Sequence, residues 1–187
     1  MSDSQTIPAE LHLTTYSPEE TIALGRRIGQ AIQSNLFIAL AGDLGAGKTT
    51  FTKGLAAGLG IPHTVTSPTF TLVNDYSYGR GSLARRLVHV DLYRLEGGSP
   101  AELDGIGFGD LLDDLEASAE FGLLVLVVEW ADRLGQQMPG ERLDIASALD
   151  EEQPDVRIFT LTALGERAVD LLRRLTDQPT YLGAGAE

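Results

Sequence analysis

One glycine-rich stretch of the chain has the residue types and spacing of a phosphate-binding loop. Residues 42–50 read GDLGAGKTT, in which Gly42, Gly47, Lys48 and Thr49 satisfy the pattern G-x-x-x-x-G-K-[ST]. Glycines allow successive backbone N–H groups to turn inward onto phosphate oxygens. The lysine then reaches the β and γ oxygens, and the hydroxyl that follows it ligates Mg²⁺. The pattern therefore predicts a nucleotide-binding loop, against the alternative of a solvated turn in a glycine-rich protein.

The lysine of this loop is one of very few in the sequence. Of the 14 basic residues only Lys48 and Lys53 are lysines, and all the others are arginines. A compact ammonium on a slim side chain fits among phosphate oxygens in a way that a planar guanidinium does not reproduce. A lysine kept at this position therefore supports the phosphate-binding interpretation.

Two acidic residues each end an apolar run of strand length. The run LVHVD ends at Asp91, and the run LLVLVVE ends at Glu129. Sites in α/β sheets lie at the carboxyl ends of strands, and a phosphate loop needs a nearby carboxylate to help it hold metal. Both acids could serve, one close to Mg²⁺ and the other ordering a water. The alternative for each is a strand-end carboxylate that faces solvent.

Two further segments could border the same site. Trp130, the only tryptophan, directly follows Glu129 and suits either packing or the site. The stretch TSPTFTL at 66–72 places the hydroxyls of Ser67 and Thr69 where a switch-like segment would approach the γ-phosphate. Taken alone, these residues favour the proline-bearing start of a strand.

The nucleotide is expected to be ATP. Guanine-specific proteins with such a loop usually carry an Asn/Thr-Lys-x-Asp element, and neither lysine here is followed by an aspartate two positions on. Disulfides and thiolate metal sites are excluded, because the chain has no cysteine. His63 and His89 have no partner at metal-ligand spacing, so we expect a surface histidine and a strand histidine.

The surrounding sequence predicts the elements that position these residues. Ser17, Pro18 and two acids signal the start of a helix that continues to about Ile32. A strand at 36–40 then leads into the phosphate loop, and a helix from Lys48 to about Gly60 follows it. Later strands are expected at 69–78, 85–93, 122–130, 142–149 and 156–164, with helices within 100–116 and at 165–175.

These elements predict an α/β fold, a P-loop NTPase-like three-layer sandwich with a mostly parallel central sheet. The strands at 69–78 and 85–93 would form an antiparallel β-hairpin arm, and the very apolar strand ending at Glu129 would lie centrally. We expect one domain over residues 1–177, with its core at about 12–176, and a flexible tail over 178–187.

The net charge bears on partners. With 27 acidic and 14 basic residues the chain carries −13, which repels phosphate backbones and acidic membrane surfaces. Any nucleic acid in its pathway is therefore expected to be held by a partner. The sequence also has no apolar stretch long enough to span a membrane and no targeting pattern at its start, so we expect a soluble, cytoplasmic protein.

Four segments in this order, GDLGAGKTTF, SPTFTLV, DLYRL and VEW, resemble the TsaE (YjeE) family from about Thr21 to about Ile158. The resemblance implies a P-loop NTPase fold that binds ATP or ADP with Mg²⁺ and hydrolyses ATP slowly. It also implies work with the TsaD–TsaB complex, which transfers a threonylcarbamoyl group to tRNA. The acceptor would be the adenosine 3′ of the anticodon in tRNAs that read codons beginning with A, reached only through the complex.

The resemblance also implies roles for residues. Thr49 and Glu129 would hold Mg²⁺, Asp91 would assist hydrolysis and is a third candidate ligand, and 67–69 would form a switch-like segment. The catalytic set would be Lys48, Asp91 and Glu129. The nucleotide contacts would be Gly42, Asp43, Leu44, Gly45, Ala46, Gly47, Lys48, Thr49, Thr50, Ser67, Thr69 and Trp130.

Other interpretations stay open at this point. A P-loop kinase for a small molecule would use Arg133 and Arg142 on a lid, although a β-arm replaces the helical acceptor domain that a kinase usually inserts. A nucleotide-sensing adaptor that does not hydrolyse ATP is a third possibility. The chain departs from the family pattern by an insert that brings Arg80, Arg85 and Arg86 together, either a solvated loop tip or a contact for partner or RNA.

Overall fold

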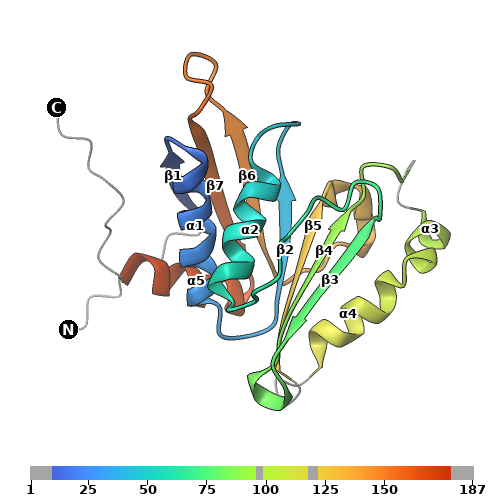
Figure 1. Ribbon diagram of the computed structural model, residues 1–187. Helices are drawn as coiled ribbons and strands as arrows, with labels where there is room; N and C mark the ends of the chain where they lie inside the picture. The colour runs from blue at the N-terminus through green and yellow to red at the C-terminus, as the bar shows by residue number, and fades with distance from the viewer. Residues whose placement is uncertain (1–9, 96–98, 118–121, 178–187) are drawn as a thin grey trace, which may run out of the picture.

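A seven-stranded sheet forms the centre of the protein in the computed structural model, which describes residues 10–95, 99–117 and 122–177 (Figure 1). The strands are β1 (Glu10–Thr15), β2 (Leu36–Ala41), β3 (Val73–Tyr78), β4 (Arg85–Asp91), β5 (Leu123–Glu129), β6 (Arg142–Leu149) and β7 (Arg157–Leu164). Their order across the sheet is β1-β7-β6-β2-β5-β4-β3. The tail predicted over 178–187 lies outside the described residues.

The middle of the sheet is parallel and its margins are antiparallel. Strands β6, β2, β5 and β4 pair in parallel, whereas β7 pairs antiparallel with β6 and β1 antiparallel with β7. Every residue of β5 is buried, and the strand lies between β2 and β4, as its apolar run predicted. Five of the seven strands therefore share one direction, in agreement with a mostly parallel sheet.

The predicted hairpin is present, but it is not a separate arm. Strands β3 and β4 pair antiparallel from Val73↔Val90 to Tyr78↔Arg85. Strand β4 also pairs in parallel with β5 along its whole length, which makes the hairpin the edge of the central sheet. Strand β4 is apolar, and it is stabilised by pairing with β5 as well as with β3, so the hairpin joins the sheet.

Helices cover both faces of the sheet. They are α1 (Pro18–Ala31), α2 (Lys48–Gly58), α3 (Pro100–Gly105), α4 (Phe108–Glu116) and α5 (Glu166–Asp177). Helices α1, α2 and α5 pack on one face, and α3 and α4 on the other (Figure 1). Successive residues of β2 serve the two layers in turn, with Ile38 in the first core and Phe37 in the second. The result is the predicted three-layer arrangement.

Local signals explain where the first two helices lie. The Ser17 side chain accepts a hydrogen bond from the Glu20 N–H and Pro18 opens α1, as the capping pattern predicted. Helices α1 and α2 then approach closely through glycines. A Cβ on Gly54 would lie 2.1 Å from the Ile22 carbonyl oxygen, and one on Gly25 would lie 2.2 Å from that of Phe51. This contact holds α2, and with it the phosphate loop, against the core.

One strand boundary differs from the sequence-based expectation, and one strand was not expected at all. The strand expected from residue 69 begins only at Val73, because the N–H groups of Thr71 and Leu72 both donate to the Pro68 carbonyl and form a turn. The segment at 66–72 is therefore not a strand start. Strand β1 was not predicted, and its Leu11 and Leu13 pack against the core beside β7.

None of the described helices has the length and apolar character needed to cross a membrane.

Candidate nucleotide site

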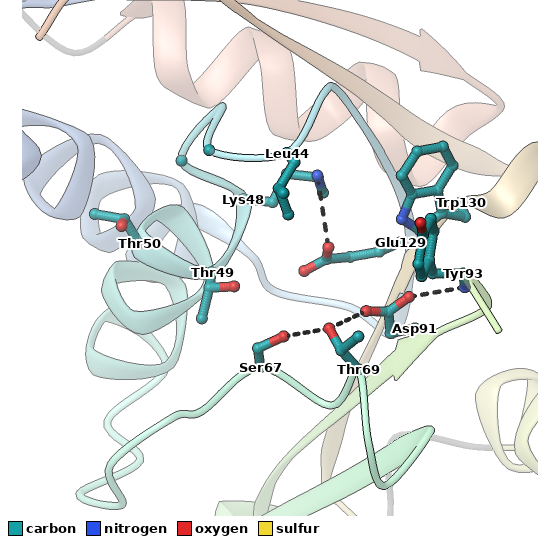
Figure 2. A pocket seen from close by; sticks show the side chains of 12 residues that line it. Leu44, Lys48, Thr49, Thr50, Ser67, Thr69, Asp91, Tyr93, Glu129 and Trp130 are labelled. Carbon is teal, nitrogen blue, oxygen red and sulfur yellow. Dashed lines mark hydrogen bonds and ion pairs between the residues drawn. The ribbon is translucent and has the colours of Figure 1, made fainter. Parts of the chain in front are cut away.

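A pocket of about 470 Å³ opens at the carboxyl ends of β2, β4 and β5. The register places Asp91 directly opposite Glu129, and Glu129 opposite Leu40 at the end of β2. Figure 2 shows both acids pointing into the space below the phosphate loop. The lining residues are Leu44, Gly45, Gly47, Lys48, Thr49, Thr50, Ser67, Thr69, Asp91, Tyr93, Glu129 and Trp130.

The phosphate loop turns sharply between β2 and α2. Gly42 has φ 142° and lies against β6, where an added Cβ would come within 2.3 Å of the Ser147 carbonyl oxygen. Gly47 has φ 90° and caps the start of α2. Residues with a Cβ rarely adopt these backbone angles, so both positions favour glycine. The turn directs the amino end of α2, with its unpaired N–H groups and partial positive charge, toward the pocket.

Lys48 lies under this loop. Its Nζ donates to the carbonyl oxygens of Gly42 at 2.8 Å and Asp43 at 3.0 Å. It also lies 3.8 Å from Glu129 Oε2, and both side chains are almost fully buried. The ammonium is therefore held between two loop carbonyls and one carboxylate at the edge of the pocket.

The second acid belongs to a chain of hydrogen bonds that reaches the 66–72 segment. Asp91 Oδ2 accepts a 2.7 Å hydrogen bond from the Thr69 hydroxyl, whose oxygen lies 2.8 Å from that of Ser67. Asp91 Oδ1 accepts a 2.8 Å hydrogen bond from the Tyr93 N–H. Figure 2 shows this chain along the lower edge of the pocket. The predicted switch-like segment and the predicted hydrolytic acid are therefore in direct contact.

An aromatic pair closes one side of the pocket. Trp130 has φ 60°, an unusual angle for a bulky residue, and its ring lies 5.2 Å from that of Tyr93. The Lys48 ammonium lies 5.6 Å from the Trp130 ring centre, within range of a cation–π contact. Trp130 therefore lines the pocket and also packs against the second core.

Most of the residues expected to contact nucleotide come together, with three exceptions. Gly42, Asp43 and Ala46 do not line the pocket. The first two contribute carbonyl oxygens to Lys48, and the side chain of Ala46 is buried. These residues shape the loop from behind, because a turn that presents its N–H groups on one side must place other residues on the opposite side.

Two residues at the site were missed. Tyr93 lines the pocket. His89 is fully buried, and its Nε2 lies 2.9 Å from Glu129 Oε1. His89 precedes Asp91 by two positions on the same strand, and alternation puts such residues on one face. That spacing was a usable signal for His89, which is a strand histidine as expected but also a neighbour of the site.

The donor set fits a magnesium ion held mainly by a nucleotide. The Thr49 hydroxyl and the carboxylates of Glu129 and Asp91 are hard oxygen donors around one pocket. Across the described ranges there is no group of three or more His, Cys, Asp or Glu side chains that could hold a metal ion. Magnesium is commonly bound by one or two carboxylates together with substrate phosphates, so the residues present suit that ion.

The arginines named in the alternative interpretations are already engaged. Arg133 donates to the backbone carbonyls of Leu92, Tyr93 and Leu95, and Arg142 binds Asp144 and the Pro139 carbonyl. Both hold loops in place, and neither lines the pocket. This weakens the kinase interpretation.

The arginines of the predicted insert differ from one another. Arg86 pairs with Asp75 and Asp114, and the hydrogen bond that it donates to Asp75 raises the pKa of its guanidinium. Arg85 donates to nearby carbonyls at the start of β4. Arg80 is exposed at the turn. Arg85 and Arg86 therefore lie in β4 and bind groups of this chain, and of the three arginines only Arg80 is exposed at the turn.

Comparison with known proteins identifies the family. A model of the family described as "Threonylcarbamoyl adenosine biosynthesis protein TsaE" matches residues 15–158. The chain belongs to the TsaE family. The match spans nearly the same residues as the resemblance noted in the sequence, and it includes the phosphate loop, both strand-end acids and Trp130.

Curated relatives agree with the TsaE assignment. The "tRNA threonylcarbamoyladenosine biosynthesis protein TsaE" of Bacillus subtilis is 39% identical over 168 residues, which cover 89% of this chain and 94% of the relative. The protein of the same description from Streptomyces coelicolor is 40% identical over 147 residues, covering 77% and 90%. The crystal structure of Bacillus subtilis YdiB matches with a TM-score of 0.65 and 35% identity, covering 89% of this chain and 94% of that one.

Proposed function

We propose that this TsaE-family chain binds Mg-ATP and hydrolyses it slowly in support of tRNA threonylcarbamoyladenosine biosynthesis. The observation that carries the proposal is the convergence of Lys48, Asp91 and Glu129 in one pocket at the amino end of α2. A strand, a glycine-rich turn and a helix in this order fit a P-loop NTPase fold. The relatives named for this pathway support the biological setting.

The loop and Lys48 would bind the phosphates. The amino end of α2 offers unpaired N–H groups and partial positive charge to an anion. The Lys48 ammonium, now shared by two loop carbonyls and Glu129, would exchange these contacts for β- and γ-phosphate oxygens. Thr49 and Glu129 would hold Mg²⁺, which neutralises charge on the same phosphate oxygens.

Asp91 suits a water better than it suits the metal. Both of its carboxylate oxygens already accept hydrogen bonds, from Thr69 and from the Tyr93 N–H, so its orientation is fixed. In the proposed reaction a water that donates to this carboxylate attacks the γ-phosphorus, and the bond to the bridging oxygen of ADP breaks. Lys48 stabilises the charge that collects on the phosphate oxygens. The products are ADP and inorganic phosphate.

The pocket mouth offers a surface through which a partner could detect the nucleotide. Leu44 at the tip of the phosphate loop is 94% exposed, and Phe70 in the 66–72 segment is 81% exposed. Tyr93, which lines the pocket, is also exposed. Large apolar side chains on the surface often mark a protein interface. We propose that the TsaD–TsaB complex docks here when nucleotide is bound.

The charge balance fits a protein that does not hold tRNA by itself. A net charge of −13 repels the phosphate backbone, so tRNA would be bound by the TsaD–TsaB complex and reached only indirectly. We place this activity in the cytoplasm, and we propose that the chain from 1 to 177 works as one domain. ATP turnover would reset the transferase complex between rounds of modification.

A capture experiment tests the docking. The purified chain, immobilised through a tag, is mixed with TsaD and TsaB in buffers that contain Mg-ATP, Mg-ADP or EDTA. We expect both subunits to be retained with Mg-ATP and washed away in EDTA. Equal retention in all three buffers would contradict nucleotide-dependent docking. Phosphate transfer to a small-molecule acceptor in the same preparation would revive the kinase interpretation.

A further inference from the structure

His89 is a buried histidine with a single hydrogen bond, and that bond is to the site. It lies on β4, two residues before Asp91, and its side chain is fully buried. Its Nε2 lies 2.9 Å from Glu129 Oε1 on the neighbouring strand. Its other ring nitrogen, Nδ1, has no hydrogen-bond partner among the described residues. Figure 2 shows the carboxylate that His89 contacts at the centre of the pocket.

Packing alone does not explain a histidine at this position. Three neighbours on the same face of the sheet, Leu87, Val125 and Val127, are aliphatic and fully buried, and the half-buried Asn74 lies opposite His89 on β3. A buried polar atom without a partner destabilises a fold, and an aliphatic side chain would avoid that cost. The contact with Glu129 is therefore the feature that distinguishes histidine from leucine here.

That contact determines which way the Glu129 carboxylate faces. Its Oε1 is held by His89, and its Oε2 lies on the opposite side, 3.8 Å from the Lys48 ammonium. With Oε1 engaged, rotation of the carboxylate is restricted and Oε2 stays directed at the pocket. A ligating carboxylate whose second oxygen is hydrogen-bonded is already oriented, so metal binding need not order it.

We propose that His89 is a positioning residue, which holds Glu129 so that Oε2 is presented to Mg²⁺ bound with the nucleotide. The inference rests on the proposed function, because it assumes that Glu129 is a magnesium ligand. His89 itself touches neither metal nor nucleotide in this proposal. Its effect is confined to the magnesium dependence of binding, and nucleotide affinity without metal should not depend on it.

The test replaces the imidazole with side chains that keep or lose the hydrogen bond. His89→Leu removes the donor at similar size, His89→Gln carries an amide N–H near the position of Nε2, and His89→Asn carries one that falls short of it. Trp130, the only tryptophan, borders the pocket, so its fluorescence is used to follow ADP binding. Each variant is titrated with ADP in EDTA, and then with Mg²⁺ at fixed ADP.

We expect His89→Leu and His89→Asn to raise the Mg²⁺ concentration for half-maximal binding by about 10-fold or more, with ADP affinity in EDTA within about 2-fold of wild type. His89→Gln should restore most of the magnesium response. A purely structural role would weaken ADP binding in EDTA as well, and that result would overturn the proposal. So would a magnesium response in His89→Asn equal to that of His89→Gln, a comparison that stands even if His89→Leu does not fold.

Failure of this inference can be told apart from failure of the proposed function. If wild-type protein binds ADP with no dependence on Mg²⁺, Glu129 is not a magnesium ligand and the proposed site is wrong. If wild type responds to Mg²⁺ and all three variants need the same Mg²⁺ concentration as wild type, the site stands and the role of His89 is refuted.

Discussion

The hydroxyl of Thr69 donates a 2.7 Å hydrogen bond to Asp91 Oδ2, and this joins the 66–72 segment to the end of β4. The segment precedes β3, and its Leu72 carbonyl accepts a second hydrogen bond from the Asp91 N–H at 2.9 Å, so the segment and the acid are tied together at two points. A segment held in this way can respond to whatever occupies the pocket.

Thr69→Val removes the hydroxyl and keeps the shape of the side chain. We expect ATP hydrolysis to fall by about 10-fold or more, because Asp91 loses a bond that orients it and a positioned acid or base contributes about 10²–10⁴-fold. ADP affinity should stay within about 2-fold, since Asp91 is proposed to act on the water. Phosphate release and Trp130 fluorescence measure the two quantities. Thr69→Ser, which keeps the hydroxyl, is the control, and equal loss of rate in both variants would count against the role of the bond.

Lys48→Arg tests whether the site needs an ammonium. The lysine side chain fits beneath the loop, with its Nζ 2.8 Å from the Gly42 carbonyl oxygen, in a space that a planar guanidinium does not fill in the same way. We expect ATP affinity measured by calorimetry to fall by about 10-fold or more in Lys48→Arg, as in Lys48→Ala. Lys53→Arg, the same exchange at the other lysine, is the matched control and should bind like wild type. If Lys48→Arg binds ATP as tightly as wild type, the site does not need an ammonium at this position.

Phe70→Ser tests the proposed docking surface. The ring is 81% exposed and does not line the pocket, so we expect nucleotide binding to persist while capture of the TsaD–TsaB complex with Mg-ATP falls several-fold. Leu83→Ser removes a comparable apolar side chain, 75% exposed, from the turn between β3 and β4. Capture should be normal for this control. A similar loss in both variants would point to a general effect of surface polarity.

Gly54→Ala tests the contact between α1 and α2. A Cβ there would lie 2.1 Å from a backbone oxygen, so the helices must separate, and we expect the free energy of unfolding to fall by about 1–3 kcal/mol. Gly109→Ala in α4 adds the same methyl group where nothing lies within 4 Å. That variant should be equally stable or more stable by up to about 1 kcal/mol. Urea unfolding of both variants gives the comparison, and equal stabilities would contradict the packing described.

Features set by local chemistry could be predicted from the sequence. Ser17 and Pro18 indicated the start of α1 because capping depends on a few adjacent residues. Asp91 and Glu129 were placed at one edge of the sheet because each ends an apolar run, and their register confirms it. The turn between β2 and α2 was located from the spacing of its glycines and from the apolar run and helical pattern on either side.

Features that depend on residues distant in the sequence could not be predicted. Strand β1 exists because it pairs with β7, about 150 residues later in the chain, and its half-polar sequence resembles an unstructured lead. The hairpin is part of the central sheet because β4 pairs in parallel with β5. His89 needed Glu129 beside it before its role could be seen. In each case the deciding contact joins residues that no local window contains.

The most direct test of the central claim is the time course of threonylcarbamoyladenosine formation on tRNA with the TsaD–TsaB complex and either wild-type protein or Asp91→Ala. If ATP turnover resets the complex, the variant should support the first round of modification at the normal amplitude and then stop, whereas wild type continues. Equal loss of the first and later rounds, or continued turnover by a variant shown not to hydrolyse ATP, would contradict the proposed role.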